Sequence, residues 1–159
     1  MDDVAACTNV LFEIAEAMDG WHTDRLVELF AEAALVDGES GTVFATGGDA
    51  ALAHFAAVVK VHSDGTWRTK HVTTNPIVSI DGDTAMVRSI FTVFQQTDLI
   101  ALQPIIAGRY HDTFRRTGEG WCLVERRYFA DLVGDLSDHL SADVRLEGPT
   151  GGDAPPRRR

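Results

Sequence analysis

The chain has 159 residues, enough for one domain with a substantial hydrophobic core. Hydrophobic residues make up 45% of the sequence and charged residues 24%, which is the composition of an ordinary globular protein. The formal net charge of −10 argues against nucleic acid and anionic membranes as partners, because both carry negative charge themselves.

The cysteines and the first residues of the chain bear on its compartment. Cys7 and Cys122 have neither a CxxC spacing nor a zinc-ligand spacing, and two lone thiols suit a reducing environment. The acidic start, Met1-Asp2-Asp3, is not followed by the apolar run of a signal peptide, and no stretch has the length of a membrane span. We therefore expect a cytoplasmic protein.

Three amphipathic helices are predicted in the first part of the chain. Apolar residues recur there at spacings of three and four, which is typical of helices with one buried face. The expected helices are Val4–Met18, a second that begins at Thr23 or Asp24 as its cap, and Asp49 to about Val61. Asp19-Gly20 is expected to end the first helix, since glycine tolerates the left-handed conformation of a helix cap.

Alternating apolar and polar residues predict strands. The expected strands are Leu35–Val36, Thr42–Ala45, His71–Ile80, Thr84–Gln95, Ile105–Arg116 and Trp121–Leu132. The expected turns between them include Asp37–Gly41, Asp81-Gly82-Asp83 and Gly118-Glu119-Gly120. A short helix at Val133–Leu140 is expected to close a domain of residues 1–140. Glycine, proline and charge dominate residues 141–159, for which we predict a disordered tail.

This order of elements predicts an α+β fold. Long antiparallel strands with helices on one side form a curved sheet, and three helices wrapped around its concave face give a cone-shaped α+β barrel. Such an arrangement encloses a pocket rather than a solid core.

Several stretches resemble the SnoaL-like superfamily, which has the nuclear-transport-factor-2-like fold. The resembling stretches are Met18-Asp19-Gly20, Asp24 through Phe30, His71 through Asn75, Gly108 through Arg116 and Trp121 through Phe129. The resemblance covers roughly Val4 to Leu140 and implies the fold more strongly than the function. The superfamily contains dehydratases, isomerases, cyclases, epoxide hydrolases and non-enzymatic binding proteins.

Within the superfamily, the site pattern is most similar to scytalone dehydratase and hexachlorocyclohexane dehydrochlorinase. The resemblance places a catalytic histidine at His71, an aspartate at Asp19 and an active-site arginine at Arg126, with Asn75 as a further pocket residue. One position departs from the pattern, because Ile14 stands where the dehydrochlorinase has a pocket lysine. The same chemistry on the same substrate therefore does not follow.

Each of these three residues has a structural alternative. His71 can act as a general base near neutral pH, or be a strand histidine bonded to the backbone. Asp19 can orient the imidazole and stabilise its cation, or be part of a turn, with Asp24 as the competing carboxylate. Arg126 and Arg127 point to opposite sheet faces, and the register puts Arg126 inside, where it binds substrate or forms an ion pair.

Aromatic residues complete the expected pocket. Tyr110 and Tyr128 are predicted to face inward and to contact the substrate, although packing is the commoner role of such tyrosines. Trp21 and Trp67 are placed at the pocket mouth, with core packing as the alternative. The sequence contains no metal-ligand spacing, phosphate loop or dinucleotide motif, so no metal and no cofactor is expected.

The leading functional hypothesis is a cofactor-independent lyase or isomerase, dehydratase-like, that acts on a hydrophobic cyclic small molecule by His–Asp acid–base chemistry. The alternative is a non-catalytic small-molecule-binding or subunit-association module, and epoxide hydrolysis is a third option. Apolar residues on both faces of Thr84–Gln95 also predict a homo-oligomer, a dimer or trimer, that buries the outer sheet face.

Overall fold

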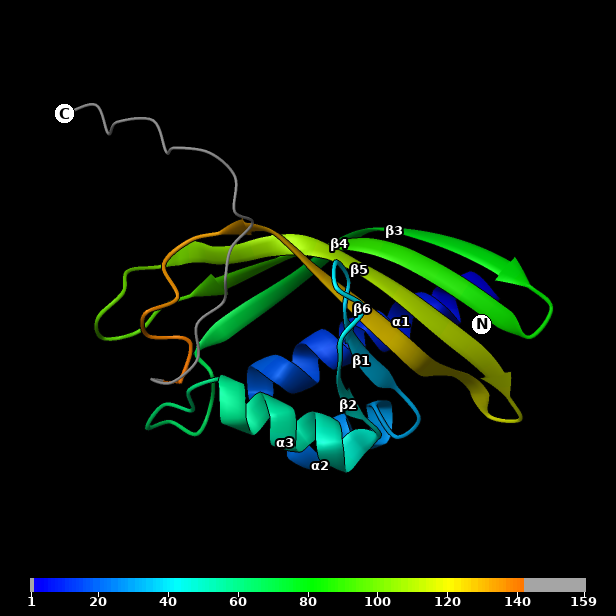
Figure 1. Ribbon diagram of the computed structural model, residues 1–159, viewed down its shortest axis with the longest axis horizontal. Helices are drawn as coiled ribbons and strands as arrows, with labels where there is room; N and C mark the ends of the chain where they lie inside the picture. The colour runs from blue at the N-terminus through cyan, green and yellow to red at the C-terminus, as the bar shows by residue number, and fades with distance from the viewer. Residues whose placement is uncertain (1, 142–159) are drawn as a thin grey trace.

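The computed structural model describes residues 2–141, which fold into one mixed sheet and three helices (Figure 1). The helices are α1 (Asp3–Gly20), α2 (Thr23–Leu29) and α3 (Gly48–Val58), and the strands are β1 (Ala34–Asp37), β2 (Val43–Thr46), β3 (Thr69–Asp81), β4 (Thr84–Gln95), β5 (Gln103–Thr117) and β6 (Gly120–Val133). The predicted α+β class is confirmed. The predicted tail lies outside the described residues, apart from Ser141.

The six strands lie in the order β2-β1-β6-β5-β4-β3. β3 to β6 form the predicted antiparallel meander, and all three helices lie on one face of the sheet (Figure 1). The β1–β2 hairpin joins this meander because β1 pairs parallel to β6, with Leu35 opposite Arg126. The sheet is therefore mixed rather than wholly antiparallel, which local periodicity could not indicate.

The first helix ends two residues later than predicted. It begins with a side-chain cap, in which Asp2 accepts the backbone N–H of Ala5. Its last helical residue is Gly20, and Trp21 rather than the glycine takes the left-handed conformation, with φ of 52°. The expected glycine cap was wrong: Asp19 lies in the last helical turn, and its carboxylate accepts hydrogen bonds from β3.

Three other element boundaries differ from the prediction. Neither Thr23 nor Asp24 caps α2, because the capping position is His22 and makes no side-chain bond. The third helix stops at Val58. The predicted closing helix at 133–140 is absent: β6 continues to Val133, and the chain then turns and forms an isolated bridge between Leu140 and Val59. That bridge satisfies backbone groups that a helix would otherwise have paired.

Two hydrophobic clusters stabilise the fold. The larger lies between the helices and the sheet, and its most buried large side chains include Leu11, Ile14, Phe30, Phe114 and Trp67. The smaller contains Phe91, Val93, Ile105 and Tyr110, with Tyr128 and Leu136 packed against it. Within the smaller cluster, Tyr110 lines one cavity and Phe91 lines another, as described below.

The outer sheet face carries apolar residues. Along β4, Val87, Phe91 and Val93 are buried, whereas Met86 and Ile90 alternate with them and are exposed, Met86 by 59%. The two-faced pattern expected from the sequence is therefore present. None of the helices within residues 2–141 is long and apolar enough to cross a membrane.

Candidate functional site

Asp19 and His71 meet where the last turn of α1 packs on the start of β3. The Asp19 Oδ1 atom lies 2.7 Å from His71 Nδ1, and the Asp19 carboxylate also accepts the His71 backbone N–H at 3.0 Å and the Thr69 hydroxyl at 3.1 Å. The competing carboxylate, Asp24, is exposed in α2. Of the two acids considered from the sequence, Asp19 is the one that contacts the histidine.

The Asp19–His71 pair is shielded from solvent, with side-chain exposures of 8% and 9%. An ionised carboxylate can only accept a hydrogen bond, so the neutral imidazole must carry its proton on Nδ1, and Nε2 is then the basic nitrogen. A histidine and a carboxylate in this geometry can serve as a general base and its orienting acid.

His71 lines a narrow inner cavity between α1 and the sheet. The other lining residues are Leu11, Ile14, Ala15, Met18, Thr73, Tyr110 and Arg126. The cavity has no room for a water molecule. Ile14 occupies its α1 wall, so this wall is apolar where the resembling dehydrochlorinase pattern has a lysine. The described side chains therefore form a dry environment beside the histidine, in which electrostatic interactions are strong.

Arg126 faces inward as predicted, but its charge is already paired. Its Nε and one terminal nitrogen donate to the two carboxylate oxygens of Asp112, both at 2.8 Å, and the two residues are 1% and 2% exposed. Burial alone would lower the pKa of Arg126, but the adjacent Asp112 carboxylate outweighs it and raises this pKa. The ion pair considered from the sequence is present, and its partner is Asp112.

Sequence reasoning gave Asp112 no role of its own. The available signal was cross-strand register, because Asp112 lies directly opposite Arg126 in the β5–β6 ladder. That register depends on bulges after Ala107 and Thr113, which the alternating pattern does not reveal. Arg127 faces the other way, as expected, and pairs with Glu125.

The predicted tyrosines form an aromatic layer with Phe91. Phe91 stacks on Tyr110 at 4.3 Å, Tyr110 meets Tyr128 edge-on at 5.2 Å, and the Arg126 guanidinium lies 4.2 Å from the Tyr110 ring centre. The Tyr128 hydroxyl is buried and has no hydrogen-bond partner in the described part of the chain. Such an unpaired group costs about 1–3 kcal/mol of stability.

A larger outer cavity lies under α3, on the other side of Tyr128. Its volume is about 380 Å³, and its walls are Leu35, Asp37, Phe44, His54, Phe55, Val58, Phe91, Ile106, Tyr128 and Ala130. We call it the outer chamber. Sequence reasoning assigned most of these residues no role in the site, because they come from six elements and share no local motif. Of these residues, sequence reasoning placed Phe55, Tyr128 and Ala130 on inward faces, and it assigned only Tyr128 to the site.

The remaining predicted site residues lie elsewhere. Trp67 is 2% exposed and packs in the core. Its ring centre lies 6.1 Å from that of His71 and 4.8 Å from that of Trp21. Trp67 is therefore behind the Asp19–His71 dyad rather than at a pocket mouth. Asn75 is exposed at a β3 bulge, where its φ of 54° reverses the facing of the strand. Its substrate-binding role stays a prediction, without a contact to the cavity.

The comparisons with known proteins agree with this fold. A family model described as a SnoaL-like domain matches residues 1–127. The chain belongs to this SnoaL-like family. No curated protein matches it. Within residues 2–141, no three histidine, cysteine, aspartate or glutamate side chains are grouped so that they could hold a metal ion.

Solved structures of the same fold include proteins with different descriptions. A candidate scytalone dehydratase from Novosphingobium aromaticivorans has 21% identity and a TM-score of 0.66, with 94% of each chain covered. LinA has 18% identity and a TM-score of 0.61, with 91% of this chain and 93% of LinA covered. The beta subunit of a candidate aromatic-ring-hydroxylating dioxygenase from N. aromaticivorans has 16% identity and a TM-score of 0.63, with 81% and 89% covered. At these identities the likeness shows the fold alone.

Proposed function

We propose that the chain is a cofactor-independent lyase or isomerase, dehydratase-like, whose general base is His71 and whose substrate is a hydrophobic cyclic small molecule. The observation that carries this proposal is the 2.7 Å contact between Asp19 Oδ1 and His71 Nδ1 in a shielded site beside a narrow cavity that Tyr110 and Arg126 also line. A neutral histidine held by a carboxylate in this way is prepared to accept a proton at Nε2.

In the proposed reaction, His71 Nε2 removes a proton from a substrate carbon next to a carbonyl or beside a leaving group. The imidazolium that forms is stabilised by Asp19, and the proton returns either to the leaving oxygen or to another carbon. A tyrosine hydroxyl, on Tyr110 or Tyr128, donates a hydrogen bond to the oxygen on which negative charge develops. Arg126 lines the same cavity as His71, and its charge is balanced there by the Asp112 carboxylate.

Two neighbours of similar fold support this class of function indirectly, since one is described as a candidate scytalone dehydratase and the other is LinA. The alternative is a non-catalytic binding or subunit-association module. It is favoured by the dioxygenase beta-subunit neighbour and by the closed cavity beside His71. Epoxide hydrolysis has less support, because it needs an arginine between two carboxylates, and Arg126 contacts one.

The proposal is tested by a double-mutant cycle on a substrate found by mass-spectrometric screening of hydrophobic cyclic compounds. His71→Ala should lower the turnover rate by roughly 10²–10⁴-fold while the protein stays folded, because the side chain borders a cavity. Asp19→Asn should lower it as well, because a neutral amide cannot stabilise the imidazolium. The double variant should be little worse than His71→Ala alone, since the two groups act as a unit.

The matched control is His22→Ala, which removes an exposed histidine near the same helix end and should keep full activity. The rate should also fall at acidic pH, where a protonated imidazole cannot accept a proton. Thermal melts report folding for each variant. Full activity of a folded His71→Ala protein, or losses that simply multiply in the double variant, would exclude the dyad and favour the binding-module alternative.

A further inference from the structure

The Asp19–His71 dyad depends on one short stretch of chain, residues 67–71, at the start of β3. The Thr69 hydroxyl donates to Asp19 Oδ1 at 3.1 Å, and the His71 backbone N–H donates to Asp19 Oδ2 at 3.0 Å. The imidazole of His71 meets the same carboxylate at 2.7 Å. The placement of the 67–71 stretch therefore sets the distance between the acid and the base.

This stretch contains a residue in an uncommon backbone conformation. Arg68 has a φ of 53°, in the left-handed region, although it is not a glycine. That conformation costs free energy, so neighbouring contacts must hold it. The Arg68 guanidinium pairs with Asp64 and Asp98, both at 3.0 Å. Both acids are largely exposed to water, which weakens these two ion pairs.

On the buried side, the stretch is held by the side chain of Gln95. Gln95 is 1% exposed and lies directly opposite Thr69 in the β3–β4 register. Its amide nitrogen donates to the backbone carbonyl of Trp67 at 3.0 Å. The two inward-facing residues before it on β4, Phe91 and Val93, are apolar. Gln95 is therefore a polar group at the end of an apolar row, and its hydrogen bond goes to the stretch that carries the dyad.

The amide nitrogen of Gln95 also faces the segment that follows β6. The Asp138 backbone carbonyl lies 3.5 Å from this nitrogen, and His139 Nδ1 lies 3.4 Å from it. Because the carbonyls of Trp67 and Asp138 can only accept, the amide must turn its NH₂ group toward them. Burial lowers the pKa of His139 to about 4, so its imidazole is neutral at pH 7 and Nδ1 can accept as well.

The segment 134–141 is itself anchored at this end of the sheet. The Lys60 backbone N–H donates to the His139 carbonyl at 2.9 Å, and the Lys60 ammonium pairs with Asp138. Figure 1 shows the segment running from β6 toward the end of α3, at the end of the sheet where β3 begins. The family model ends at residue 127, so this support lies outside the part of the chain that the model matches.

We propose that Gln95 is a positioning residue for the dyad. By holding the Trp67 carbonyl, it fixes the stretch that carries Thr69 and His71, and so keeps the imidazole at hydrogen-bond distance from Asp19. The segment 134–141 supports the amide from its other side. This deepens the proposed function, on which the expected effect on the reaction rate rests. The expected effect on the orientation of His71 does not depend on catalysis.

The orientation is tested by NMR on the full-length chain without any substrate. Gln95→Met keeps the length of the side chain and removes both amide donors. Long-range proton–nitrogen correlation spectra at mildly alkaline pH show which imidazole nitrogen carries the proton, and the His71 signal is assigned by its loss in His71→Ala. Wild type should show His71 protonated on Nδ1. Gln95→Met should show a mixture of the two tautomers, because the imidazole is no longer held against Asp19.

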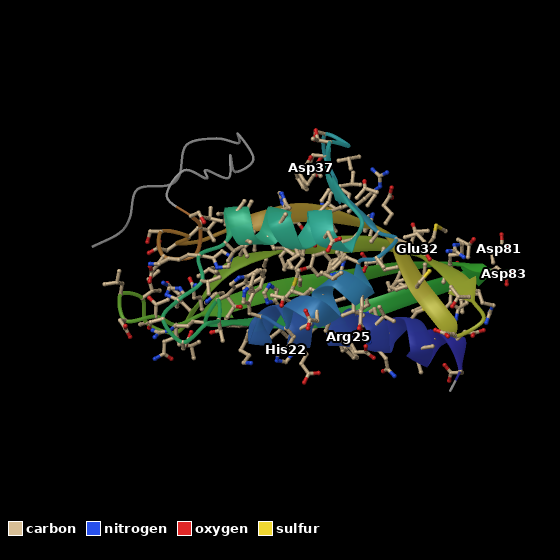
Figure 2. The ribbon with its side chains drawn as sticks, turned by 90° about the horizontal axis from the view of Figure 1, so that it is seen from below. His22, Arg25, Glu32, Asp37, Asp81 and Asp83 are labelled. Carbon is tan, nitrogen blue, oxygen red and sulfur yellow. The ribbon has the colours of Figure 1, made fainter. Side chains whose placement is uncertain are left out.

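Two controls accompany this measurement. Gln96→Met makes the same substitution at the neighbouring, exposed glutamine and should leave the His71 signal as in wild type. His22 lies exposed on the helical side of the molecule (Figure 2), and it serves as an internal reference whose signal should not change. Gln95→Leu is the second variant if Gln95→Met does not give a cooperative thermal melt.

The kinetic test uses the substrate found for the proposed function. Gln95→Met should lower kcat by roughly 10- to 100-fold, the loss expected when a catalytic group is slightly misplaced. KM should change by less than about 2-fold, because Gln95 lines neither the inner cavity nor the outer chamber. Combined with Asp19→Asn, the substitution should add little further loss, since both act through the orientation of the same imidazole.

Three results would overturn the proposal: an unchanged His71 signal in folded Gln95→Met, a kinetic loss confined to KM, or losses that multiply when Asp19→Asn is added. The two proposals fail separately. If His71→Ala is fully active while Gln95→Met mixes the tautomers, the enzyme hypothesis fails and the positioning role stands. If the dyad is active and Gln95→Met keeps the wild-type kcat and tautomer, the positioning role alone fails.

Discussion

The Arg126–Asp112 pair offers the sharpest test of how the interior is built. Both residues are almost fully buried, and the guanidinium donates to both carboxylate oxygens at 2.8 Å. Asp112→Asn keeps the side-chain shape but removes the negative charge and turns an NH₂ group toward the guanidinium donors. Arg126 is then a buried cation without a counterion.

The expected cost follows from that burial. Breaking a buried ion pair by removing one partner costs about 3–5 kcal/mol, because the remaining charge stays desolvated. For a chain of this size, each kcal/mol lowers the melting temperature by about 2–4 °C, so Asp112→Asn should melt about 6–20 °C below wild type. The joint replacement Asp112→Leu with Arg126→Met should recover most of this loss, because it removes both charges and keeps an apolar volume.

Thermal and urea unfolding monitored by circular dichroism measure both effects. Arg127→Met, which alters the half-buried arginine on the opposite face, is the control and should change the free energy of unfolding by well under 3 kcal/mol. An Asp112→Asn protein that melts within about 2 °C of wild type would show that the pair is not buried and paired as described. If the joint replacement is folded but inactive, Arg126 also acts in the reaction rather than only in folding.

Two further predictions concern stability at low pH and assembly. Burial lowers the pKa of His139 to about 4 from the ordinary 6.5, so between these two pH values the unfolded chain binds more protons than the folded chain. The free energy of unfolding should therefore fall by roughly 3 kcal/mol as the pH is lowered from 6.5 to 4. His139→Phe should flatten this pH dependence, as measured by urea titrations. We also expect a dimer or trimer that assembles through the outer sheet face, because this face exposes apolar residues. Met86→Asp should dissociate this oligomer. Sedimentation velocity that shows the wild-type protein as a monomer at micromolar concentration would contradict the prediction.

Much of the fold could be predicted because its signals are local. The β4 strand was predicted to the residue, since alternation runs from Thr84 to Gln95 and a turn at Asp81-Gly82-Asp83 precedes it. The pairing of β1 with β6 could not be predicted, because it joins segments about ninety residues apart and leaves no trace in either. The segment 133–140 has its apolar residues at Val133, Leu136 and Leu140, a helical spacing, but the structure has a turn there and an isolated bridge between Leu140 and Val59.

The candidate site was predictable in part for a different reason. Alternation places Tyr110 and Arg126 on inner faces, but the approach of Asp19 to His71 across 52 positions was expected only from the family resemblance. The local signal for Asp19 was a helix-ending turn, and that interpretation failed because Trp21 took the left-handed position. The outer chamber depends on side-chain packing from six elements, which no single pattern contains.

The two inward-facing carboxylates differ in their electrostatic state, and this difference supports the assignment of the base. The charge of Asp112 is balanced by Arg126 at 2.8 Å. Asp19 is held by neutral donors, and its nearest cation is the exposed Lys70 ammonium, 3.8 Å away, which water screens. In the proposed reaction, the imidazolium formed at His71 lies against the Asp19 carboxylate, whereas Asp112 already has Arg126 as its counter-ion.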